Sequence, residues 1–145
     1  AKLVAKYRER YLDIGYKENT LYPDVVNTLQ MLKMQDQRMA ICTSKPERTA
    51  RLVLELFQID SYFEFVSGGD VGVAKWMQIE QLLADKVVDK STLMIGDRAV
   101  DLTAAHQNGI HAGGVLWGYG SELELSAQSP RYLFNMVKDW ENMRS

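Results

Sequence analysis

Short apolar runs alternate with segments of helical periodicity along most of the chain, and this alternation limits the folds that the chain can adopt. The apolar runs cover residues 39–43, 63–66, 92–96, 110–116 and 131–134. Between them, apolar residues recur every three or four positions, as in Val26, Leu29 and Leu32. Alternating strands and helices favour a doubly wound parallel sheet with helices on both faces. We therefore predict one α/β domain, for which 145 residues are sufficient.

The composition indicates which classes of partner and which cellular compartment to expect. The formal net charge is −2 and no run of Lys or Arg stands out, so we expect no nucleic-acid partner. A single cysteine, Cys42, excludes an internal disulfide and fits the reducing cytoplasm. Its place inside a predicted strand is typical of a small buried hydrophobic residue. No apolar stretch is long enough to span a bilayer, so we expect no membrane partner.

The segment Thr92–Asp101 carries two aspartates after a buried strand. Asp97 comes directly after the predicted strand, at the edge where open α/β sheets bind ligands. Asp101 falls in the first turn of the next helix, four residues on, and can face the same way. Two such carboxylates can hold a hard divalent cation such as Mg²⁺. The alternative is structural: Asp97 caps the helix and Asp101 complements its dipole.

A second candidate site follows the strand at residues 39–43. Thr43 and Ser44 bring hydroxyl groups to the end of this strand, just before a predicted helix. Such a hydroxyl and the exposed N–H groups of a helix start can bind phosphate. Ser44 and Glu47 also have the spacing of a capping box, with Pro46 suited to a first turn. Phosphate binding and capping are compatible, and both interpretations stay open here.

Lys75 is the third candidate. Counting back from Ile79 and Leu82, it lies on the inward stripe of its helix, in the first turn, where a cation opposes the dipole. An inward lysine in such a place needs an anionic partner, which could be Asp97, Asp101 or a phosphate. The alternative is that its aliphatic stem passes the edge of the core and the ammonium reaches water.

The glycine-containing loop 116–121 and the two histidines give weaker signals. The loop could approach a ligand or be an ordinary turn, and it lacks the third glycine and the position of a dinucleotide fingerprint. His106 and His111 show no ligand spacing with each other or with Cys42, and we interpret both as structural.

Taken in order, Thr43, Lys75 and Gly96-Asp97-x-x-x-Asp101 resemble the second, third and fourth motifs of the haloacid dehalogenase-like hydrolases. The resemblance is to the phosphoglycolate phosphatase branch and covers nearly the whole chain. The segments that carry it are Tyr22–Val25, Thr43–Pro46, Met94–Arg98 and Gly114–Ser121.

The resemblance implies a Rossmann-like core and a Mg²⁺-dependent phosphomonoester hydrolase acting on a small phosphorylated metabolite. Thr43, with Ser44, would bind the phosphoryl group, and Lys75 would offset its charge. Asp97 would ligate the metal, and Asp101 would orient Lys75 or a metal-bound water. The sequence does not separate a phosphoglycolate phosphatase from a pyrophosphatase, a nucleotidase or a sugar-phosphate phosphatase, and a homodimer is compatible with the resemblance.

The chain departs from the family at the first motif. The aspartate nucleophile of D-x-D-G-T stands on the first, central strand in this family, and the sequence contains no D-x-D pair after an apolar strand. Leu3, Tyr7, Tyr11 and Ile14 have helical spacing. We therefore expect residues 1–16 to be the last helix of a cap, 17–22 a hinge, and 23–145 the C-terminal part of the core, without its central strand.

Two consequences follow for function. We expect this polypeptide, as written, not to turn over substrate, with the nucleophile upstream. The approach to Lys75, residues 70–74, is also shorter and more apolar than the family usually has. A receiver domain uses similar residue types, but there the acidic cluster comes first and the lysine last. A non-catalytic binding or scaffold protein, or a truncated inactive fragment, stays open as the alternative.

Overall fold

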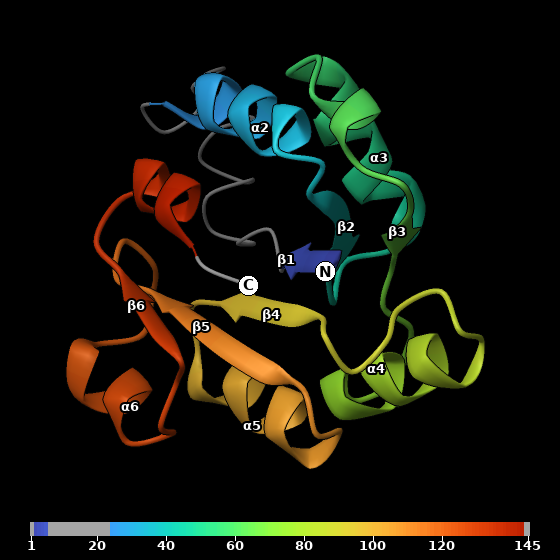
Figure 1. Cartoon of the computed structure of the whole chain (residues 1–145). Helices are drawn as coiled ribbons and strands as arrows, with labels where there is room; N and C mark the ends of the chain where they lie inside the picture. Colours follow the sequence, from blue (N-terminus) through green and yellow to red (C-terminus); the bar gives the residue numbers. More distant parts are fainter. Residues whose placement is uncertain (1, 6–23, 144–145) are drawn as a thin grey trace.

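The computed structural model describes residues 2–5 and 24–143, and it has three layers with a sheet between two sets of helices (Figure 1). The strands are β1 (Lys2–Ala5), β2 (Arg38–Cys42), β3 (Val66–Ser67), β4 (Leu93–Gly96), β5 (His111–Val115) and β6 (Tyr132–Phe134). The α-helices are α2 (Val25–Met34), α3 (Glu47–Leu56), α4 (Lys75–Ala84), α5 (Ala99–Gln107) and α6 (Glu122–Ser126), with 3₁₀ turns η1 (Asp60–Tyr62) and η2 (Val137–Asn142).

All strand pairs in the described sheet are parallel, and the spatial order is β3-β2-β1-β4-β5-β6. The chain leaves the centre in both directions, through β2 and β3 on one side and through β4 to β6 on the other. This order is that of a doubly wound sheet, and it confirms the predicted fold class. The carboxyl ends of the strands therefore share one edge, with β1 between β2 and β4.

The start of the chain differs from the expectation. Residues 2–5, expected in an opening helix, form strand β1 and occupy the central place that we expected to be vacant. Leu3 is in register with Met39 of β2 and with Leu93 of β4. The physical reason is that β2 and β4 each present an inner edge of backbone donors and acceptors, which one strand satisfies on both sides. The rest of the expected cap helix, 6–16, and the hinge, 17–22, lie outside the described residues.

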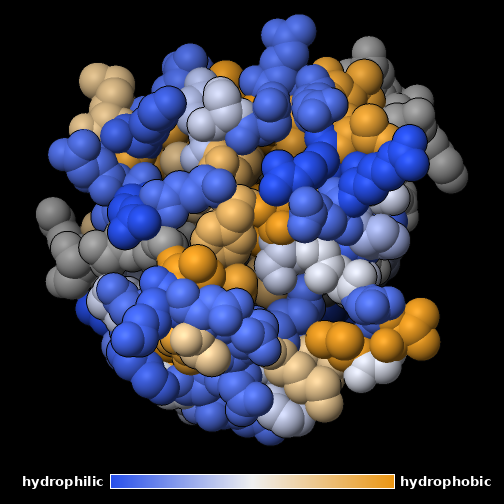
Figure 2. Space-filling view, turned by 90° about the vertical axis from the view of Figure 1, so that its right-hand side faces the viewer, coloured by the Kyte–Doolittle hydropathy of each residue, from blue (hydrophilic) through white to orange (hydrophobic). Residues whose placement is uncertain are grey.

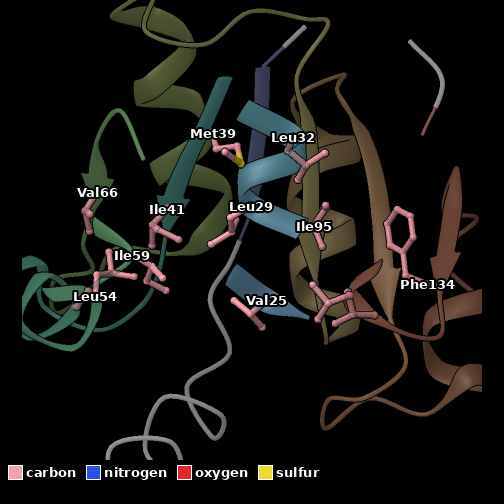
Figure 3. Close-up of a cluster of buried hydrophobic side chains, with 13 residues drawn as sticks. Val25, Leu29, Leu32, Met39, Ile41, Leu54, Ile59, Val66, Ile95 and Phe134 are labelled. Carbon is pink, nitrogen blue, oxygen red and sulfur yellow. The ribbon is translucent and has the colours of Figure 1, made fainter. Parts of the chain in front are cut away.

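Two buried clusters fill the spaces on either side of the sheet. Alternate residues of β2 point to opposite faces: Met39 and Ile41 join the cluster under α2 and α3, and Ala40 and Cys42 join the one over α4, α5 and α6. Figure 3 shows the first cluster, where Val25, Leu29 and Leu32 of α2 lie over the sheet. Burial of Cys42 between layers agrees with its interpretation as a small apolar residue.

Three segments differ in detail from the sequence-based expectation. The strand expected at 63–66 is reduced to Val66–Ser67, preceded by η1. The sequence pattern also predicts a last helix over 136–143, where the structure has the 3₁₀ turn η2. Helix α6 was not predicted, because it has only five residues. In the described part of the chain, no helix has the length and apolar character needed to cross a bilayer.

The face that carries α3, β3 and α4 is mostly hydrophilic, and its exposed apolar side chains form small separate groups (Figure 2). They come from both helices and from the loop that leads into α4. The exposed apolar residues of these segments are Leu52, Leu56, Val71, Val73, Trp76 and Met77. The helices thus direct their larger apolar stripes inward, toward the sheet.

Candidate functional site

The predicted site residues gather at the carboxyl edge of the sheet. Thr43 follows β2 directly and Asp97 follows β4 directly, and one strand, β1, separates them. Two strand spacings correspond to roughly 10 Å. Thr43, Lys75, Asp97 and Asp101 are all buried, with exposures of 0%, 8%, 2% and 0%. Polar side chains that are buried together at one edge must satisfy one another, the backbone or a ligand.

Thr43 forms the first part of the site. Its N–H donates to Ser67 O at 2.9 Å, and its Oγ1 accepts from the Lys45 N–H at 3.2 Å. Helix α3 starts at Glu47 with Pro46 as its N-cap, and no side chain caps it. The capping-box interpretation of Ser44 and Glu47 is therefore wrong, because proline takes the cap position. The Ser44 side chain is exposed.

Two glycines after β3 bring a second loop against this one. A Cβ atom on Gly68 would lie 2.2 Å from the Glu47 nitrogen, and one on Gly69 would lie 2.2 Å from Ser44 O. The Gly69 N–H donates to Lys45 O at 2.8 Å. Only residues without a side chain allow this approach, so Gly68 and Gly69 fix the course of the loop after β2.

Lys75 points into the site and not toward solvent. It is the first residue of α4, and its Nζ donates to Cys42 O, at the end of β2, at 3.2 Å. The interpretation in which its ammonium reaches water past the core edge is wrong, because this bond places the charge next to Thr43. The acceptor in this bond is a backbone carbonyl oxygen.

Asp97 is enclosed by the glycine loop that follows β5. Its Oδ2 accepts from the Tyr119 N–H at 3.1 Å, and its backbone carbonyl accepts from the Gly120 N–H at 2.9 Å. A Cβ on Gly118 would lie 2.3 Å from the Asp97 Cβ and 2.7 Å from Oδ2. The loop at 116–121, left open between a ligand contact and a turn, thus serves to hold this carboxylate.

Asp101 lies in the first turn of α5, as the dipole interpretation requires, and it also makes the capping bond that the alternative had given to Asp97; the N-cap residue is Arg98. Its Oδ2 accepts from the Arg98 N–H at 3.2 Å, which closes the first turn of α5. The turn also packs onto Gly96, where a Cβ would lie 2.4 Å from the Asp101 Cβ. A carboxylate can accept about four hydrogen bonds, so a cap at one oxygen is compatible with a second role.

The sequence reasoning missed two positioning elements: the loop contact with Asp97 and the amide of Gln78. Gln78 is 6% exposed, and its Nε2 donates to Thr43 O at 3.0 Å. Its position three residues after Lys75, on the same helix face, was the available signal. His106 and His111 are exposed and lie at the end of α5 and the start of β5, at the opposite edge of the sheet.

Glu124 of α6 ties α6 to the start of α5. Its Oε2 accepts from the Ala99 N–H at 2.8 Å and from Arg98 Nε at 2.9 Å. The Ala99 backbone bond, followed by the Arg98 side chain, lowers the pKa of Glu124 below its usual 4.5. In turn Glu124 raises the pKa of Arg98. The contact fixes α6 beside the helix that carries Asp101.

Replacing Glu124 by Gln is therefore expected to lower the free energy of unfolding at pH 7. A lowered pKa contributes stability above the unfolded value of about 4.5, and that stability is lost as the pH falls through the folded pKa. The free energies of unfolding of the wild type and of Glu124→Gln, measured with urea, should differ at pH 7 and become equal in acid. Glu122→Gln, on the exposed face of the same turn, is the matched control. An equal difference at pH 7 and pH 3 would contradict this account.

The site has few protein ligands of the kinds that metals use. Among residues 2–5 and 24–143, no three His, Cys, Asp or Glu side chains are close enough together to hold an ion. A pair of carboxylates suits Mg²⁺, which keeps several waters and takes one or two carboxylates together with substrate phosphate.

Comparison with known proteins agrees with this geometry. The chain is 33% identical over 133 residues to a 5'-nucleotidase of Pseudomonas aeruginosa, covering 89% of this chain and 60% of the relative. It is 33% identical over 130 residues to a phosphoglycolate phosphatase of Aliivibrio fischeri, covering 87% and 57%. The crystal structure of a predicted phosphoglycolate phosphatase from Haemophilus somnus superimposes with a TM-score of 0.76 at 28% identity, covering 90% and 62%.

The chain thus spans less than two thirds of the length of these three proteins. The family model for haloacid dehalogenase-like hydrolases matches residues 1–115, and this match includes β1 to β5 and the four buried site residues. The chain belongs to the haloacid dehalogenase-like hydrolase family.

Proposed function

We propose that this chain provides the phosphate- and metal-binding part of a Mg²⁺-dependent phosphomonoester hydrolase. The observation that carries the proposal is the burial of Thr43, Lys75, Asp97 and Asp101 at one edge of a parallel sheet. Each comes from a different strand end or helix start, so packing alone does not require this set of polar residues. The substrate class is a small phosphorylated metabolite, in keeping with relatives described as a 5'-nucleotidase and phosphoglycolate phosphatases.

The residues present fit a magnesium ion. Asp97 and Asp101 are buried carboxylates, and Gly118 leaves just enough room for Asp97 beneath the loop after β5. Hard oxygen donors of this kind are those that Mg²⁺ prefers. When bound, Mg²⁺ would act as a Lewis acid that neutralises charge developing on the phosphoryl oxygens.

The chain's own residues would hold the phosphoryl group. The Thr43 hydroxyl and the backbone after β2 can donate hydrogen bonds to its oxygens. Lys75 brings an ammonium with three donors, one of which is directed to Cys42 O. A fixed positive charge in a water-poor site stabilises the transferring phosphoryl group more strongly than it would in water.

We assign no nucleophile among these residues. In the sequence, Lys6, Tyr7 and Arg8 follow central strand β1, and no D-x-D pair occurs. We therefore expect the 145-residue chain to bind phosphate with Mg²⁺ and to release none from a phosphomonoester. For the full-length protein we propose turnover in the cytoplasm, and a homodimer is compatible with this activity.

Calorimetric titration of the chain with inorganic phosphate, with and without Mg²⁺, tests the proposal, together with a phosphate-release assay. Saturable binding that requires Mg²⁺, without turnover of p-nitrophenyl phosphate, is the expected result. The alternative, a non-catalytic binding or scaffold protein with a decayed site, predicts no binding of either ion. That result would overturn the proposed function.

Replacing Lys75 by Met is expected to weaken phosphate binding by about 10- to 100-fold, because one charge-assisted hydrogen bond is lost. Methionine has a similar length and can fill the same buried space, so the fold should persist. Phosphate titration of Lys75→Met in the presence of Mg²⁺ measures the effect. Lys86→Met, at the opposite end of α4, is the matched control and should bind like the wild type. Equal affinities of the two variants would remove Lys75 from the phosphate site.

A further inference from the structure

The amide of Gln78 is buried at a point where three loops meet. Gln78 lies in α4, three residues after Lys75, and only 6% of it is exposed. Its Nε2 lies 3.0 Å from Thr43 O and 3.1 Å from Gly68 O, and 3.4 Å from both Ser67 O and Ser67 Oγ. One side chain of α4 thus contacts the ends of both β2 and β3.

The acceptors fix which way the amide points. Thr43 O, Gly68 O and Ser67 O are carbonyl oxygens, which accept hydrogen bonds and cannot donate them. The group that faces them must therefore be the NH₂ of Gln78, and its two hydrogens match the two shortest contacts. Buried carbonyls that lost this donor would carry a desolvation cost, so the contact is specific for an amide.

Each of the two short contacts orients a peptide plane. No described peptide bond is cis, and in a trans peptide the C=O and the following N–H point in opposite directions. With Thr43 O held toward Gln78, the Ser44 N–H points away from α4. With Gly68 O held likewise, the Gly69 N–H points to Lys45 O, to which it donates at 2.8 Å.

We infer that Gln78 is a positioning residue that sets the phosphate-binding loop after β2 relative to Lys75. This inference rests on the proposed function, since it assigns a purpose to the orientation of the Thr43–Ser44 peptide. Gln78 holds that peptide from the same helix that presents Lys75. The Thr43 hydroxyl, the Ser44 N–H and the Lys75 ammonium are thereby placed as one unit. Gln78 itself touches no reacting atom.

Gln78→Met removes the donors and keeps the length of the side chain, and Gln78→Glu turns a carboxylate toward carbonyl oxygens. The affinity for inorganic phosphate, measured with Mg²⁺ present, is expected to fall at least about tenfold in both. The Gln78 amide contacts the ends of β2 and β3, whereas Asp97 and Asp101 follow β4, on the other side of β1. Binding of Mn²⁺ alone, followed by electron paramagnetic resonance, should therefore stay at the wild-type level. A merely structural role would weaken both kinds of binding together.

Gln81, one turn further along α4, provides matched controls. Its side chain is exposed and donates to Asp85 Oδ1 at 2.9 Å, so Gln81→Met and Gln81→Glu should bind phosphate like the wild type. Amide hydrogen exchange supplies a readout that needs no ligand: the Gly69 N–H should exchange faster in Gln78→Met than in Gln81→Met.

The outcomes separate the two claims. Equal phosphate affinity and equal Gly69 exchange in Gln78→Met and Gln81→Met would overturn the positioning role and leave the proposed function standing. A wild-type chain that binds no phosphate would overturn the proposed function, and the positioning role with it, even where exchange responds to Gln78→Met. The inference is supported if the Gln78 variants lose phosphate binding and retain Mn²⁺ binding, while the Gln81 variants retain both.

Discussion

Replacing Asp97 by Asn should strongly weaken Mg²⁺-dependent phosphate binding while the chain stays folded. The substitution removes one negative charge from a carboxylate that is 2% exposed, at the end of the strand beside β1. It keeps the shape of the side chain and an oxygen that can accept from the Tyr119 N–H, now 3.1 Å from Oδ2. Loss of charge opposite a dication is expected to weaken metal binding by at least about tenfold. Isothermal titration with Mg²⁺ in the presence of phosphate measures this directly.

The matched control for Asp97→Asn is Asp85→Asn. Asp85 is exposed at the C-terminal end of α4, and the bond that it accepts from Gln81 can be kept by an asparagine oxygen. The control should bind Mg²⁺ like the wild type, and both variants should unfold in one cooperative transition. Undiminished Mg²⁺ binding by Asp97→Asn would exclude this residue as a metal ligand.

Replacing Gly118 by Ala is expected to disturb Asp97 directly and to lower both stability and metal affinity. The new Cβ would lie 2.3 Å from the Asp97 Cβ, a distance that no side-chain rotation relieves. Either the loop or Asp97 must move, at a cost of about 1–3 kcal/mol in the free energy of unfolding. Because the same loop donates the Tyr119 N–H to Asp97, Mg²⁺ affinity should fall together with stability.

Gly109→Ala separates the loss of stability from the loss of metal binding. Gly109 follows α5 with a φ of 70°, a conformation that costs alanine about 1 kcal/mol. It lies at the opposite edge of the sheet, so this variant should lose stability and keep its Mg²⁺ affinity. Urea unfolding and Mg²⁺ titration of both variants test the distinction. Wild-type Mg²⁺ affinity in Gly118→Ala would show that the loop does not position Asp97.

The sequence predicts the strands and helices of the core correctly wherever the local hydrophobic pattern matches the burial that the folded chain imposes. In β2, Arg38–Cys42, every residue after the first is buried and alternate residues enter opposite layers, which produces a continuous apolar run. Strand β1 was missed because Leu3 and Tyr7 have a helical spacing. Its pairing with β2 on one side and β4 on the other is a tertiary effect that four residues cannot reveal.

A candidate site residue could be predicted from the sequence where its residue type and its place at the end of a strand or the start of a helix suffice to single it out. Thr43 and Asp97 were singled out in this way and Lys75 from the inward stripe of its helix, and all three are buried. Gln78 was missed because its partners belong to loops far from it in the sequence, and its spacing from Lys75 does not reveal what its amide contacts. The clash that keeps Gly118 a glycine depends likewise on Asp97, 21 positions earlier, and only the folded chain brings the two together.

The central claim is that a metal ion binds between Asp97 and Asp101 at the carboxyl edge of the sheet, and paramagnetic broadening by Mn²⁺ tests it most directly. Amide signals of Arg98 and Tyr119, which donate to these two carboxylates, should broaden first in a titration with phosphate present. Signals of Arg38 and His111, at the amino ends of β2 and β5, should stay sharp. Broadening confined to exposed acidic residues such as Asp70 and Glu55, with Arg98 and Tyr119 unaffected, would contradict the account.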